Sequence, residues 1–149
     1  MSFESSKRSD SLSLTFIFLS FLISLIATLG SLFFSEIMNF IPCSLCWYQR
    51  IFMYPLVFLF LINLLFPDDK IFKYAFPLVF IGWIISIYHN LLMFKIIPEN
   101  LSPCVQGVPC SVHYIDWFGF ITIPLLSFFA YTIILILLII LKRENINAK

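Results

Sequence analysis

Charged residues are scarce in this chain, and that scarcity excludes several classes of protein. Only 11% of the 149 residues are Asp, Glu, Lys or Arg, whereas 61% are hydrophobic and the mean hydropathy is +1.01. A typical soluble domain carries about 25% charged residues, so a soluble enzyme or binding module is excluded. The net charge of +1 provides no basic surface for nucleic acid. The composition indicates a membrane protein.

Long polar segments are missing as well. Four nearly uncharged stretches are each long enough to cross about 30 Å of hydrocarbon at about 1.5 Å per residue. They are 12–34, 43–66, 74–94 and 117–141. They leave two short tails, two tight connections and a loop at 95–116, and no repeat or low-complexity linker divides the chain. The sequence predicts an all-α membrane protein with a single domain over 1–149, a four-transmembrane-helix bundle.

The first stretch follows Lys7 and Arg8, as the apolar core of a secretory signal would. It is longer than the usual core of such a signal, and no small-x-small cleavage site closes it. We therefore expect this stretch to remain in the protein as a transmembrane helix.

The positive charges predict the orientation of the bundle, because Lys and Arg concentrate on the cytoplasmic side. With both termini in the cytoplasm, Lys95 is the one positive residue outside and Arg50 lies within a helix. The cytoplasmic ones are Lys7, Arg8, Lys70, Lys73, Lys142, Arg143 and Lys149. All four cysteines then face the extracytoplasmic side, where disulfides persist.

Two of these cysteines belong to the segment CSLCWYQR, residues 43–50. Pro42 suits the first turn of a helix, so Cys43 and Cys46 should lie on neighbouring turns of one face. A helix N-terminus stabilises a thiolate and raises cysteine reactivity. Arg50 follows Cys46 by four residues and should lie beneath the pair, where it would favour a Cys46 thiolate and could donate to a ligand's carbonyl oxygen.

Two further features accompany this pair. His89 lies five residues before the end of the third stretch, about 8 Å below the outer boundary at helical rise, which makes it a candidate for the same layer as Arg50. Cys104 and Cys110 enclose five residues, among them Gly107 and Pro109, so the loop can bring the two cysteines within disulfide distance. They are either a permanent staple or the second pair of a thiol–disulfide relay.

The segment CSLCWYQR, together with PCVQGVPCS and YIDWFGFITIPLLS, resembles the disulfide bond formation proteins of the DsbB/BdbC type, most of all the BdbC branch. The resemblance implies a four-helix oxidoreductase of the bacterial cell membrane. Such a protein reoxidises an exported thioredoxin-like thiol oxidase of the DsbA/BdbD type and passes the electrons to a membrane quinone, menaquinone or ubiquinone.

The same resemblance implies a role for each site residue. Cys43 and Cys46 match the quinone-proximal pair, with Cys46 contacting the quinone, and Arg50 matches the arginine that assists the quinone. His89 lies where some members have a quinone-side histidine. Cys104 and Cys110 match the outer-loop pair that meets the partner. Better-studied relatives have a far longer stretch between these loop cysteines, including a membrane-lying helix that five residues cannot supply.

Other classes fit part of the pattern. A vitamin K epoxide reductase-like quinone reductase shares four helices and a CxxC, but there the loop cysteines come before the CxxC. A metal-binding module would need His or acidic ligands near the cysteines, so no metal ligand is assigned. A c-type haem would need His where Trp47 stands. A non-catalytic membrane protein with two disulfide staples is a further alternative.

Overall fold

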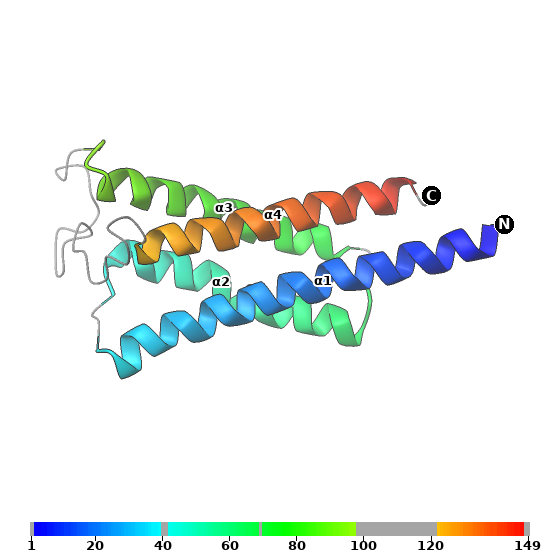
Figure 1. Ribbon diagram of the computed structural model, residues 1–149, viewed down its shortest axis with the longest axis horizontal. Coiled ribbons are helices and arrows are strands. Elements are labelled where there is room, and N and C mark those ends of the chain that lie inside the picture. Colours follow the sequence, from blue (N-terminus) through cyan, green and yellow to red (C-terminus); the bar gives the residue numbers. More distant parts are fainter. Residues whose placement is uncertain (1, 40–41, 69, 98–121, 148–149) are drawn as a thin grey trace.

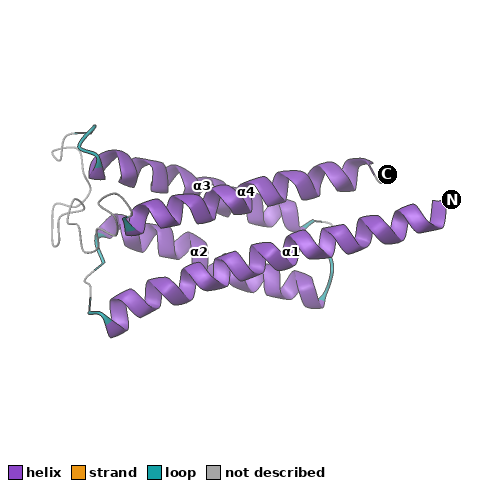
Figure 2. Ribbon diagram, in the orientation of Figure 1, coloured by secondary structure: helices purple, strands orange, loops and turns teal. Residues whose placement is uncertain are grey.

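The computed structural model describes residues 2–39, 42–68, 70–97 and 122–147. All regular elements in these ranges are helical, which confirms the predicted all-α fold (Figure 2). Helix α1 covers Ser2–Leu32 and continues into the short π-helix η1, Phe33–Ile37. The other three helices are α2, Ser44–Leu65; α3, Ile71–Met93; and α4, Ile123–Asn147.

Four of these helical segments are long and apolar enough to cross a membrane: Ser11–Ile37, Ser44–Leu65, Ile71–Met93 and Ile123–Glu144. The predicted stretches agree with them closely in the middle of the chain. Helix α1 begins before the predicted start at residue 12, because backbone hydrogen bonding continues a helix into polar residues that hydropathy leaves out. The predicted start of the fourth helix at 117 lies outside the described residues.

The helices form an antiparallel bundle in which each contacts the next along the chain, and α1 also contacts α4. Both ends of the chain lie at one end of the bundle, and the start of α2 lies at the other (Figure 1). The end of the bundle that carries the start of α2 is called the mouth below.

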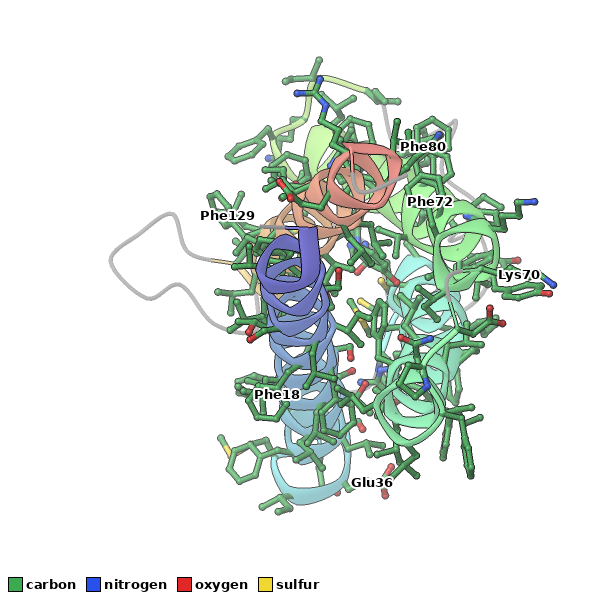
Figure 3. The ribbon with its side chains drawn as sticks, turned by 90° about the vertical axis from the view of Figure 1, so that its right-hand side faces the viewer. Phe18, Glu36, Lys70, Phe72, Phe80 and Phe129 are labelled. Carbon is green, nitrogen blue, oxygen red and sulfur yellow. The ribbon has the colours of Figure 1, made fainter. Side chains whose placement is uncertain are left out.

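Away from the mouth, the centre of the bundle is filled by apolar side chains from all four helices. Leu56 and Phe60 of α2, Val79 of α3 and Ile134 of α4 are fully buried. Outward-facing aromatic side chains project away from this core. Figure 3 shows this for Phe18, Phe80 and Phe129. The bundle therefore buries an apolar core and presents an apolar surface, as a lipid-embedded protein does.

Tyr131 ties α4 to the other helices near the mouth. Its ring is fully buried and lies directly over Gly82 of α3, where any side chain larger than hydrogen would collide with it. Its hydroxyl donates a 2.7 Å hydrogen bond to the backbone carbonyl of Gln49 in α2. Tyr131 thus positions the first turns of α2 against α3 and α4.

Candidate redox centre

Cys43 and Cys46 lie on the first turn of α2, at the mouth of the bundle. Cys43 is the N-cap residue with extended backbone angles (φ −72°, ψ 168°), and its carbonyl accepts the first helical bond from Trp47 N at 3.1 Å. Both thiols are free and their Sγ atoms are 3.1 Å apart. Cys43 is buried, whereas Cys46 is half-buried. The predicted spacing along one helix face therefore produces a pair of thiols in direct contact.

His89 of helix α3 contacts the cysteine pair. The His89 side chain is 1% exposed, and its Nε2 lies 3.7 Å from Cys43 Sγ. Apolar residues surround the contact: Leu45, Leu92 and the partly buried Ile85 and Ile97. Because these side chains exclude water, the imidazole is held against the sulfur in a low-dielectric site.

Gln49 holds the other side of the His89 ring. Its Nε2 lies 3.3 Å from His89 Nδ1, and the Gln49 side chain is buried. With the amide nitrogen donating to Nδ1, the ring proton resides on Nε2 and is donated to Cys43 Sγ. Gln49, His89 and Cys43 therefore form one hydrogen-bonded chain from the interior to the sulfur.

Reasoning from the sequence missed Gln49, although a signal for it existed. Gln49 continues the buried stripe of α2, which runs through Leu45, Met53, Leu56 and Phe60 at helical spacing. A polar residue in a mostly apolar buried stripe needs a partner, because an unpaired buried polar group is costly. The partner was not visible in the sequence, since His89 belongs to another helix.

Arg50 extends toward α1 rather than toward His89. Its Nη2 donates a 2.9 Å hydrogen bond to the carbonyl of Ser31, and its guanidinium carbon lies 5.7 Å from the Trp47 ring centroid. A single helical step of about 100° separates the directions of Gln49 and Arg50. Arg50 lies one turn after Cys46 on the same side of α2.

The electrostatics of the mouth favour a thiolate on Cys43. Hydrogen bonding from the Cys46 thiol holds the pKa of Cys43 well below its usual range; burial opposes this shift, and the bond from His89 adds to it. The N-cap position contributes in the same direction, because the free N–H groups of the first turn favour negative charge. Cys43 is therefore the first thiol of the pair to ionise.

Cys104 and Cys110 lie outside the described residues. The structure consequently gives no distance between them, or between either of them and the Cys43–Cys46 pair. Their role as a second redox pair stays a prediction.

A four-helix membrane bundle with two contacting thiols at a helix N-terminus belongs to the class of membrane thiol–disulfide proteins. Comparison with known proteins assigns it more narrowly. The family model described as "Disulfide bond formation protein DsbB" matches residues 13–141. This chain belongs to that family, and its role is that of a membrane disulfide oxidoreductase.

Individual relatives agree with this assignment. "Disulfide bond formation protein C" of Bacillus subtilis is 50% identical over 132 residues, which cover 89% of this chain and 96% of the relative. "Probable disulfide formation protein C" of Halalkalibacterium halodurans is 44% identical over 126 residues, covering 85% of this chain and 92% of the relative. No solved structure is significantly similar to this one. The predicted BdbC-type resemblance is confirmed.

Proposed function

We propose that this protein is a quinone-linked thiol–disulfide oxidoreductase that reoxidises an exported thioredoxin-like thiol oxidase of the DsbA/BdbD type. The observation that carries the proposal is the Cys43–Cys46 pair, with sulfurs 3.1 Å apart and His89 hydrogen-bonded to one of them. Two thiols at this distance are positioned to form and break a disulfide. The positive-residue distribution supports an extracytoplasmic mouth in the bacterial cell membrane.

The partner would enter through the outer-loop pair. A thiolate of the reduced partner attacks Cys104 of the Cys104–Cys110 disulfide and forms a mixed disulfide. The partner's second thiolate then displaces Cys104, so that the partner leaves oxidised and the loop pair is left as two thiols. One loop thiolate next attacks the Cys43–Cys46 disulfide, and a second exchange restores the loop disulfide and leaves Cys43 and Cys46 reduced.

The residues around the pair fit a quinone beside it. Arg50 is half-buried and could donate to a quinone carbonyl oxygen, and it lies on the Cys46 side of α2. The Thr28 hydroxyl of α1 is buried with no hydrogen-bond partner among the described residues, one turn before Ser31, whose carbonyl binds Arg50. A bound quinone would take up two electrons and two protons from the dithiol, menaquinone and ubiquinone being the candidate acceptors.

Within this centre, each residue has a separate task. His89 holds or donates a proton at Cys43 Sγ, and Gln49 fixes the orientation of the His89 ring. Cys46 is the sulfur that we propose meets the quinone, and Arg50 lies on the same side of α2. The apolar wall around His89 excludes water, which strengthens these interactions.

Trapping the thiols in cells by alkylation tests this route. Cells that express the protein are compared with and without quinone depletion, and the redox state of all four cysteines is recorded. We expect depletion to accumulate reduced Cys43 and Cys46 and then the reduced partner. If the redox state of this pair is the same under both conditions, the proposed quinone link is wrong.

A further inference from the structure

The folded mouth brings together three donors that are far apart in the sequence. One donor atom each from Cys43, Cys46 and His89 lies within 4.8 Å of both others, and His89 follows Cys43 by 46 residues. The spacing of the cysteines alone predicted no metal site, because no His or acidic residue lies near them along the chain. We propose that the reduced pair and His89 bind a thiophilic divalent cation of the Zn²⁺ and Cd²⁺ class.

The distances suit such an ion. In a tetrahedral zinc site, bonds of about 2.3 Å to sulfur and about 2.0 Å to nitrogen place two sulfurs roughly 3.8 Å apart and sulfur and nitrogen roughly 3.5 Å apart. Here the sulfurs are 3.1 Å apart, and Cys43 Sγ lies 3.7 Å from His89 Nε2. The third distance, between Cys46 Sγ and a His89 ring nitrogen, is within 4.8 Å. Side-chain rotations that separate the sulfurs by a fraction of an ångström and bring Cys46 Sγ toward His89 complete the geometry.

Charge favours a divalent ion over a monovalent one. Each bound thiol releases its proton, so two thiolates and neutral His89 around a divalent cation sum to zero charge. Cys43 and His89 are buried among apolar side chains, where an uncompensated charge is costly. A monovalent soft ion such as Cu⁺ would leave one negative charge there. Thiolate and imidazole ligands together match zinc and its heavier analogue cadmium.

Gln49 can also hydrogen-bond to His89 in the tautomer that binds a metal ion. A metal-bound Nε2 has no proton, so Nδ1 must carry one and needs an acceptor. The Gln49 amide already contacts Nδ1 at 3.3 Å, and rotating its last torsion presents the amide oxygen to the ring instead of the nitrogen. The same residue therefore satisfies His89 in the hydrogen-bonded state and in the metal-bound state.

The consequence for the redox reaction rests on the proposed function. Sulfurs that are bound to a metal are held as a dithiolate and are unavailable for disulfide formation. Three protein ligands leave a fourth position open for water, which makes the site accessible and exchangeable. The cation would therefore arrest the protein in its reduced form until it is removed.

The binding test uses full-length protein in which Cys104→Ser and Cys110→Ser remove the other two thiols. Cd²⁺ is titrated into the reduced, detergent-purified protein, and the thiolate-to-cadmium absorbance in the ultraviolet is recorded. We expect one equivalent to bind, with no binding after oxidation of the pair. His89→Ala should weaken binding at least tenfold, and His89→Phe, which retains a buried ring, should weaken it equally. Absence of binding, or equal affinity with and without His89, overturns the proposal.

A turnover assay separates this proposal from the proposed function. The four-cysteine protein is assayed with reduced partner and quinone while Zn²⁺ is added and then removed by a chelator. We expect reversible arrest. Turnover that continues at metal concentrations that saturate the binding assay overturns the inhibitory consequence. A protein that binds Cd²⁺ but never reduces quinone overturns the proposed function and leaves the metal site standing.

Discussion

The mouth of the bundle and its centre are held together in different ways. At the mouth, buried polar groups pair across helices, with His89 bonded to Cys43 and Gln49, and Tyr131 bonded to the Gln49 backbone. In the centre, Leu56 and Phe60 pack against apolar neighbours. In lipid, apolar packing suffices to join helices, so the polar mouth is more than stability requires. That excess of buried polar contacts marks the mouth as the functional part.

The strongest test of this contrast removes a sulfur from the mouth. Cys43→Ser or Cys46→Ser should abolish disulfide formation, because one thiol cannot form the intramolecular disulfide. The partner's redox state in cells, read by alkylation, measures the loss. Ser44→Ala lies between the two cysteines and should retain activity. Normal partner oxidation in both cysteine variants would refute the role of the pair.

The pH dependence of Cys43 reactivity should show the next largest effect. The lowered pKa of Cys43 means that its thiolate persists as the pH falls below the usual thiol value and is lost only near the lowered pKa. An ordinary thiol, with a pKa of about 8.5, loses most of its thiolate between pH 8 and pH 6. Alkylation of Cys43 in the reduced protein lacking the loop cysteines should change little over that interval.

His89→Phe provides the comparison for this measurement. It removes the hydrogen bond to Cys43 while it retains a buried ring, so the midpoint of alkylation should move to higher pH. The same logic applies to stability, because the charge on Cys43 stabilises the fold above the unfolded pKa and ceases to do so as the pH falls through the folded one. An unchanged midpoint in the variant would remove His89 from the electrostatics of Cys43.

A substitution in the apolar centre of the bundle tests the second region of the comparison. Phe60→Ala should reduce the free energy of unfolding by about 2 kcal/mol, less than in a soluble core, because lipid also solvates the ring in the unfolded state. The change in the free energy of unfolding is measured by unfolding in mixed micelles with an increasing fraction of denaturing detergent. Phe58→Ala is the matched control, since Phe58 is 65% exposed on the same helix. We expect specific activity per folded molecule to be retained in both variants.

Gln49→Leu should lower activity more than stability, whereas Phe60→Ala lowers stability and retains activity. Losing a group that orients a reactive ring typically costs about tenfold in activity or more. We expect the rate of partner oxidation to fall about tenfold, with a smaller change in stability. Ile51→Val, on the exposed side of the same helix, is the control. Full activity in Gln49→Leu would show that the His89 ring needs no support from α2.

The smallest expected effect comes from Tyr131→Phe, which removes the 2.7 Å bond to the Gln49 carbonyl and leaves the ring over Gly82. A single hydrogen bond within a membrane protein contributes about 0.6 kcal/mol. The unfolding assay should show a change of that size. Tyr74→Phe, at a tyrosine that is 55% exposed on α3, should show none.

The sequence by itself determined the class of fold and half of the site. Hydropathy set the four spans, because crossing a membrane requires a minimum length of apolar residues, and helical spacing placed Cys43 and Cys46 together on one helix face. These features depend only on residues close along the chain.

The tertiary structure alone decided which polar groups meet. Packing of α2 on α3 brings Gln49 to His89 across 40 residues and His89 to Cys43 across 46, and packing on α1 takes Arg50 to Ser31. Depth in the membrane suggested that Arg50 and His89 share a layer, but depth leaves the rotation of each helix undetermined. That rotation, set by side-chain packing between helices, selected Gln49 as the partner of His89 and made a three-ligand set out of a cysteine pair.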